Sequence, residues 1–148
     1  MKIVDLNVLL YAINEDSPQH NTALNWWMNA IRGDETVGLA WTVLSGFLRL
    51  TTHSRVFPRP LTVQQATQRV DAWLSLPIVA VPTEKPDHWK TLRGLLAAAG
   101  TAGNLVTDAH LAALALTRDA TVVSFDHDFA RFGGHPLRGF LRCQLPPA

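Results

Sequence analysis

Four aspartates lie in three short motifs near the two ends of the 148-residue chain, and carboxylates that come together can hold a metal ion. Asp5 lies in IVDLNVLLYA, Asp108 in GNLVTDAHLAALAL, and Asp126 with Asp128 in ATVVSFDHDF. Two of these motifs follow β-branched apolar runs, so we expect their acids at the carboxyl ends of buried parallel strands, where α/β sheets bind ligands. Such a cluster suits Mg²⁺ or Mn²⁺ and predicts metal-dependent cleavage of phosphodiesters.

The segments that carry these motifs alternate between predicted strands and predicted helices. Strands are expected at the start of the chain, in TVGLA, IVAV and TVVSF, and at one edge in FLRCQL. Helices are expected over residues 18–32, 43–50, 63–76, 84–99 and 107–118. The alternation predicts one α/β domain over residues 1–148, built as a three-layer α/β/α sandwich with a central, mostly parallel sheet.

Polar side chains predict where several helices begin. Ser17 before Pro18 predicts an N-cap, Thr42 predicts another, and Thr62 with Gln65 predicts a capping box. These three signals place helix starts near residues 18, 43 and 63.

Apolar periodicity predicts which residues of these helices face the core. Val63 and Leu74 belong to one predicted apolar face, and Trp89 is expected to point inward on the next helix. The adjacent Trp26 and Trp27 cannot both face one core, which makes one of them a candidate interface residue.

The charge of the chain is balanced, with 13 Lys and Arg against 12 Asp and Glu and a net charge of +1. Bulk charge therefore does not indicate nucleic-acid binding. One local exception is the acid-free stretch between Glu35 and Asp71, which can hold a polyanion or be an ordinary solvated loop. Its basic residues in TVLSGFLRLTTHSRVFPRP are Arg49, His53, Arg55 and Arg59.

Several classes of protein are excluded by what the sequence lacks. A single cysteine, Cys143, rules out a disulfide framework and a multi-cysteine zinc site, and the six histidines show no ligand spacing. The longest apolar stretches are too short to cross a bilayer, and Asp5 interrupts what would be a signal peptide's apolar region. We therefore expect a cytoplasmic protein with no membrane span.

Each acid also has an ordinary structural explanation as a helix cap, a helix N-terminal charge or a turn residue. Together, however, four converging carboxylates repel one another and require a cation or bound protons at neutral pH. Asn104 adds a polar group four residues before Asp108, so the two would share a face of a continuous helix, although Asn104 could equally be a cap.

At this point the motifs resemble those of a known family. DLNVLLYA, TDAHLAALAL and VVSFDHDFARF, in this order, are similar to the PIN-domain family and to its VapC toxins, and GFLRLTTHSRVFPRPLT resembles the central segment of one VapC subgroup. The similarity extends from Lys2 to about Pro136. It implies a magnesium-dependent endoribonuclease, a homodimer with neighbouring sites, and a small VapB antitoxin that neutralises it.

The resemblance also implies roles for individual residues. The metal carboxylates would be Asp5, Asp108 and Asp126, with Asp128 as a second candidate in its motif and Asn7 and Ser124 at polar positions beside the site. Many PIN nucleases place a Glu at the start of the helix after the second strand, where this chain offers only Thr42, Leu44 and Ser45. The absence of that Glu favours one metal ion over two.

The chemistry expected is hydrolysis of RNA by a metal-activated water. The candidate substrate contacts are Asn7, Arg49, His53, Arg55, Asn104 and Ser124. An alternative, motivated by the missing Glu, is a catalytically weak PIN module that binds RNA or only the antitoxin. A phosphoacceptor receiver domain also gathers aspartates, but none of the three lysines lies at a suitable strand end.

Overall fold

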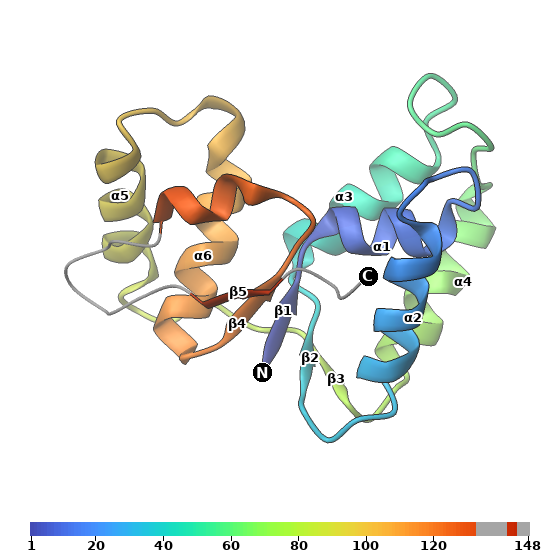
Figure 1. Cartoon of the computed structure of the whole chain (residues 1–148), viewed down its shortest axis with the longest axis horizontal. Coiled ribbons are helices and arrows are strands. Elements are labelled where there is room, and N and C mark those ends of the chain that lie inside the picture. Colours follow the sequence, from blue (N-terminus) through green and yellow to red (C-terminus); the bar gives the residue numbers. More distant parts are fainter. Residues whose placement is uncertain (133–141, 145–148) are drawn as a thin grey trace.

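The computed structural model describes residues 1–132 and 142–144, and its centre is a five-stranded sheet (Figure 1). All four pairs of neighbouring strands are parallel, in the order β3-β2-β1-β4-β5. The strands are β1 Lys2–Val4, β2 Val37–Gly38, β3 Val79–Ala80, β4 Thr121–Val123 and β5 Arg142–Gln144. Each predicted strand is confirmed, although residues 140, 141 and 145 of the predicted edge strand lie outside the described residues.

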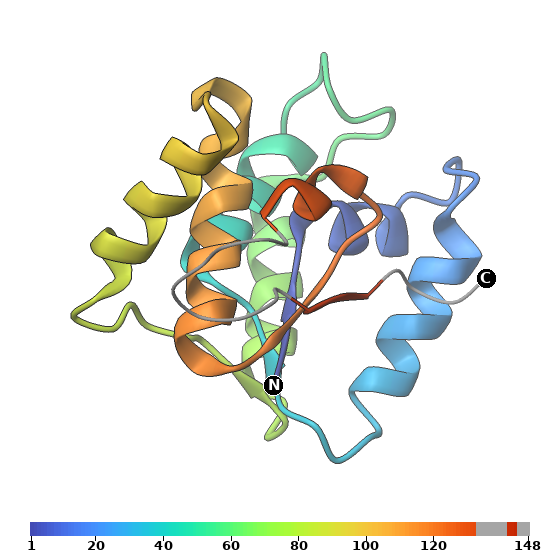
Figure 2. The ribbon, with the colours of Figure 1, turned by 60° about the vertical axis from the view of Figure 1, so that its left-hand side comes forward.

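Helices cover both faces of this sheet, which confirms the three-layer α/β/α sandwich (Figures 1 and 2). On one side four helices pack together: α1 Leu6–Ile13, α2 His20–Ala30, α3 Trp41–Thr51 and α4 Val63–Leu74. On the other side lie α5 His88–Ala99 and α6 Val106–Arg118, with the short 3₁₀ helices η1 Gly103–Leu105 and η2 His127–Phe132. No helix in the described part of the chain is both long and apolar enough to span a bilayer.

Of the three predicted helix starts, only the capping box before α4 is confirmed. The Thr62 hydroxyl accepts from the Gln65 amide at 3.1 Å, and the Gln65 side chain accepts from the Thr62 amide at 2.9 Å. The predicted Ser17 cap is wrong, because its hydroxyl accepts from the Gln19 amide within a turn, and α2 begins only at His20.

The predicted Thr42 cap is also wrong. Ala40 is the N-cap of α3, and its carbonyl accepts the first helical amides, from Val43 and Leu44. Thr42 is therefore the second residue of the helix. The Thr42 side chain is exposed and does not cap the helix.

The two adjacent tryptophans of α2 are both buried, which corrects the prediction that one marks an interface. Trp26 and Trp27 are each 6% exposed. Neighbouring residues on a helix point about 100° apart, yet both side chains belong to the hydrophobic core. Trp27 packs on Trp73 of α4 with ring centroids 5.5 Å apart, and Trp73 in turn packs edge-on to Phe47 of α3.

Three predicted core residues instead face solvent. Trp89 is 65% exposed because the inward face of α5 is formed by His88, Thr91 and Leu95. Val63 and Leu74 are exposed because they occupy the two ends of α4, beyond the stretch that packs on α3. Apolar periodicity predicted these helices correctly, but it assigned three exposed side chains to their buried faces.

Candidate active site

Asp5 joins the end of β1 to the start of α1. Its Oδ1 accepts from the Leu6 amide at 2.7 Å, so the carboxylate is the N-cap of α1, and its own amide donates to the Val123 carbonyl of β4 at 2.9 Å. Only 6% of Asp5 is exposed. Asp5 is thus a helix cap, which is the ordinary structural role considered for it from the sequence. Its second carboxylate oxygen, Oδ2, remains available for other partners.

Two polar side chains hold Oδ2 of Asp5 in place. The Ser124 hydroxyl donates to it at 2.6 Å, and the Asn7 amide nitrogen donates both to it and to Ser124 Oγ at 2.9 Å. Asn7 Oδ1 accepts from the Phe125 amide at 3.1 Å. Ser124 is fully buried, so the geometry gives it a positioning role instead of the predicted substrate contact.

The other three acids form a cluster beside Asp5. One carboxylate oxygen each from Asp108, Asp126 and Asp128 lie within 4.8 Å of one another. Asp126 is held by its amide, which donates to Ser124 Oγ at 2.9 Å, and its Oδ1 accepts from the Asp128 amide at 2.8 Å. Asp128 also forms an ion pair with Arg131 at 3.3 Å.

Burial and mutual repulsion raise the pKa values of two of these acids. Desolvation, followed by the charges of Asp5, Asp126 and Asp128, raises the pKa of Asp108 to about 7. The pKa of Asp5 is also raised, chiefly by desolvation and against the opposing effect of the Ser124 and Leu6 hydrogen bonds. The cluster therefore carries more negative charge than this environment stabilises, which is the condition that a bound cation relieves.

A pocket of about 350 Å³ opens over Asp5, Asp108 and Asp126 and is lined from α1, α3 and α6. Arg49 of α3 is the single cationic side chain among the lining residues, and Asn7 and Thr42 contribute polar groups. Asp128 is not among the lining residues. The structure thus brings the three predicted metal carboxylates into one pocket and adds Arg49 to its wall.

The start of α3 shows how the pocket is shaped where the resemblance to PIN nucleases leads one to expect a Glu. Leu44 is completely buried, Ser45 is exposed, and Thr42 reaches the pocket. A Cβ on Gly46 would lie 2.7 Å from Leu6 Cδ2, so the absence of a side chain lets α3 approach α1 at the pocket wall. No described residue of α3 supplies a carboxylate here.

The remaining predicted substrate residues lie outside this pocket. His53 and Arg55 are exposed in the loop after α3. Asn104 is exposed on η1, and the prediction that it shares an α-helical face with Asp108 is wrong, because a 3₁₀ turn has about 3.0 residues and breaks the four-residue spacing. The stretch between Glu35 and Asp71 contains no acid of its own, but acids from another segment contact it. Arg59 pairs with Glu15 at 3.6 Å and with Asp16 at 3.4 Å.

A larger cleft of about 840 Å³ lies between α2 and the start of β1, but it lacks a convergent set of reactive groups. Its acids are Asp34 and Glu35, and Glu35 is already paired with the N-terminal amine at 3.1 Å and with Lys2 at 3.5 Å. The smaller pocket, with its unneutralised carboxylates, is the better candidate for chemistry.

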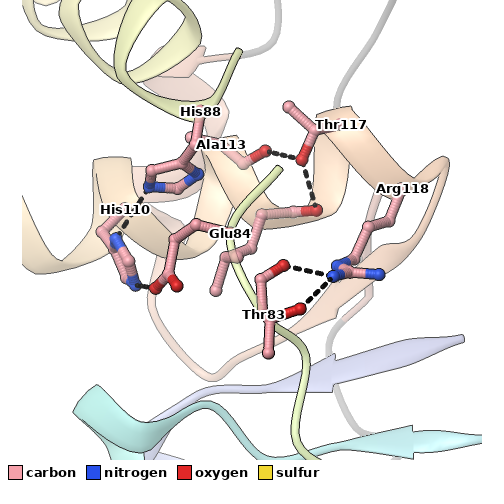
Figure 3. Close-up of polar contacts among 8 residues, drawn as sticks. Thr83, Glu84, His88, His110, Ala113, Thr117 and Arg118 are labelled. Carbon is pink, nitrogen blue, oxygen red and sulfur yellow. Dashed lines mark hydrogen bonds and ion pairs between the residues drawn. The ribbon is translucent and has the colours of Figure 1, made fainter. Parts of the chain in front are cut away.

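A second polar cluster, between α5 and α6, escaped the sequence analysis (Figure 3). His88 Nε2 lies 3.0 Å from His110 Nδ1, and His110 Nε2 lies 3.6 Å from Glu84 Oε1. Desolvation lowers the pKa of both histidines, so both are neutral at neutral pH. Because different nitrogens of His110 serve the two contacts, the three groups form a chain and not a chelating site; a spacing of 22 residues gave no sequence signal.

The fold and the pocket together define an α/β/α protein that gathers carboxylates able to hold a cation near the carboxyl ends of parallel strands. Residues 2–135 match the family model of the PIN domain. The chain is 45% identical over 148 residues to Ribonuclease VapC37 of Mycobacterium tuberculosis, an alignment that covers 100% of this chain and 99% of the relative.

Two solved structures share the fold at lower identity. VapC20 of Mycobacterium tuberculosis, described as a sarcin-ricin loop cleaving toxin, superposes with a TM-score of 0.68 at 19% identity and covers 93% of this chain and 99% of its own. VapBC2 of Rickettsia felis, bound to a DNA fragment from its promoter, gives a TM-score of 0.66 at 20% identity and covers 97% of each chain. The chain belongs to the PIN-domain family, in its VapC branch.

Proposed function

We propose that this protein is a magnesium-dependent endoribonuclease and the toxin of a type II toxin–antitoxin pair. The observation that carries the proposal is the pocket over Asp5, Asp108 and Asp126, in which burial, followed by the charges of the neighbouring carboxylates, raises the pKa of Asp108 to about 7. Clustered carboxylates repel one another and so destabilise the fold, and a bound cation relieves that repulsion. The ribonuclease relative with 45% identity supports RNA as the substrate.

The residues of the pocket fit a hard divalent cation. Carboxylate oxygens are the ligands that Mg²⁺ prefers, and Mn²⁺ accepts the same set. Asp5, Asp108 and Asp126 would hold the ion, directly or through water, and Asp128 would support it from beside the cluster. When bound, Mg²⁺ supplies a water of lowered pKa and polarises the phosphoryl oxygen.

The side chains around the acids have distinct tasks. Asn7 and Ser124 fix Oδ2 of Asp5, so that this carboxylate keeps one orientation. Arg49 offers a guanidinium to a phosphate that enters the pocket, and it stabilises negative charge that develops on the phosphoryl group. His53 and Arg55, outside the pocket, would contact flanking phosphates, which position the RNA without reading its sequence.

The wider biology follows from the VapC relatives. We infer a small VapB antitoxin as partner, supported by the VapBC2 structure that shares this fold. We also infer a homodimer, a single domain over residues 1–148 and a cytoplasmic location, where RNA and antitoxin are both present.

A second candidate function is a PIN module that binds RNA or the antitoxin but cleaves poorly. The observation that favours it is the start of α3, where Thr42 stands in the pocket and no carboxylate is supplied.

Cleavage of total RNA with and without Mg²⁺ separates these two candidates. The wild-type protein should cut RNA only with Mg²⁺, and Asp5→Asn should abolish the cut. Asp119→Asn is the matched control, because Asp119 is exposed at the far end of α6 and its left-handed backbone accepts Asn. RNA binding by the wild type without any metal-dependent cut would favour the second candidate.

A further inference from the structure

One large aromatic side chain beside the pocket faces solvent. Trp41 is the first residue of α3 and is 60% exposed. The same helix buries Val43, Leu44 and Phe47, so the core receives its apolar groups from the opposite side of α3. Stability of the fold does not require an indole at position 41.

Trp41 lies on the same side of α3 as two residues that line the acidic pocket. Residues advance by about 100° on a helix, so positions 41, 42, 45 and 49 share one arc, and Trp41, Thr42, Ser45 and Arg49 are all exposed. Two of these four, Thr42 and Arg49, line the pocket. Trp41 directly precedes Thr42, so the Cα atoms of the two residues lie about 3.8 Å apart.

The electrostatics of the pocket favour an additional, uncharged source of RNA affinity. Three carboxylates and a single Arg line it, so its own charge repels a phosphate. Counterion release by basic residues is the usual source of affinity for nucleic acid, and the whole chain has a net charge of only +1. Stacking of a base on an aromatic ring adds affinity without adding charge.

We propose that Trp41 is the stacking platform for an unpaired base of the RNA, next to the phosphate that enters the pocket. This inference rests on the proposed ribonuclease function and narrows its substrate to RNA whose bases are unstacked at the cleaved position. Proteins usually read single-stranded loops and bulges in this way, because only splayed bases expose their faces. Thr42 and Arg49 take the phosphate side of the nucleotide, and Trp41 takes its base.

The surroundings of Trp41 favour a base over a second copy of the chain. The centre of a protein interface is apolar and continuous, but the exposed neighbours of Trp41 on its arc are Thr42, Ser45 and Arg49. The other large hydrophobic side chains that the described residues expose lie on other segments: Val56, Val63, Leu74, Trp89 and Val106.

RNA binding by Trp41→Ala tests the proposal, in the full chain with Asp108→Asn to prevent cleavage. The probe is a labelled, unstructured RNA of about 12 nucleotides, within the range that one single-strand site covers. Trp89→Ala is the matched control, since it removes an equally exposed Trp from α5. We expect Trp41→Ala to weaken binding about 5- to 150-fold with an unchanged salt dependence, Trp41→Phe to recover most of this loss, and Trp89→Ala to have no effect.

Single abasic nucleotides distinguish stacking from a structural effect of the substitution. The probe is made with one base missing at each position in turn, and each version is titrated with and without Trp41. At one position the missing base should weaken binding to the parent protein and leave binding to Trp41→Ala unchanged, which is the signature of a direct pair. Equal losses at every position would overturn the proposal.

Three further outcomes decide between the alternatives. If Trp41→Ala turns a dimer into a monomer in sedimentation and no abasic position responds, Trp41 belongs to an interface and the stacking proposal fails. If wild type cleaves RNA with Mg²⁺ while Trp41→Ala binds as tightly as its parent, only the role of Trp41 is overturned. If wild type neither binds nor cleaves RNA, the proposed function fails as well.

Discussion

Replacing Asp108 by Asn should stabilise the metal-free protein at pH 8 and abolish its response to Mg²⁺. Burial and the neighbouring acids raise the pKa of Asp108 from 3.8 to about 7, so the folded state binds a proton more tightly than the unfolded state does. The stability that this proton supplies is lost as pH rises from about 4 to about 7, and above that range the ionised carboxylate is a net cost. Asn carries no such charge.

The size of the effect follows from the shift. In a fully buried site, the change from 3.8 to about 7 corresponds to about 4 kcal/mol. Asp108 is only half-buried and solvent screens its charge, so we expect about 1–2 kcal/mol. For a chain of this length that is an increase in Tm of about 3–6 °C.

Thermal unfolding of wild type and Asp108→Asn at pH 4.5 and pH 8, in EDTA and in Mg²⁺, measures how the charge of Asp108 and added Mg²⁺ change the stability. The advantage of Asp108→Asn should be present at pH 8 and small at pH 4.5, where wild-type Asp108 is protonated. Mg²⁺ at about 100 times its Kd should raise wild-type stability by about 2.7 kcal/mol and the variant by much less. Asp119→Asn should behave as wild type throughout. A variant that is less stable than wild type at pH 8 in EDTA would refute the reasoning, because the acid would then be stabilised by its surroundings.

Three other predictions test the remaining parts of the site. Arg49→Ala and Arg55→Ala should each reduce the salt slope of RNA binding by about one, measured as affinity against salt concentration; unchanged slopes would place the RNA elsewhere, with the residue 131–142 tail as the next candidate, most of it outside the described residues. Asp128→Asn should weaken Mg²⁺ affinity in calorimetric titration while Asp119→Asn does not, since only Asp128 approaches the acid cluster; equal effects would rule out a role for it. Because desolvation lowers the pKa of His88, its protonation should destabilise the fold as pH falls below about 6.5, so His88→Gln should reduce the stability lost between pH 7.5 and 5, and an unchanged loss would contradict this.

Local sequence signals were enough to locate the acids and the layers of the fold. A β-branched run followed by Asp is typical of a strand end, and Asp5 and Asp126 do follow β1 and β4. The capping box at Thr62 was equally local, since both partners lie within one turn. The expected order of strands and helices then left a parallel sandwich as the simplest arrangement.

Helix starts and apolar faces were less secure because they depend on competing partners. The Ser17 hydroxyl could have capped a helix, but it accepts from the Gln19 amide in a turn before α2. Trp26 and Trp27 looked incompatible with one core, and only the packing of α2 in the folded chain buries both.

The properties that decide function arise from contacts between distant residues. The raised pKa of Asp108 depends chiefly on burial in the folded chain and then on the charge of Asp5, more than 100 positions away. The fully buried position of Ser124, the pairing of Arg59 with Glu15 and Asp16, and the contact between His88 and His110 likewise depend on how segments pack. The sequence determined which groups are available and on which elements they lie. Only tertiary packing decided their distances, their dielectric surroundings and thus their charge.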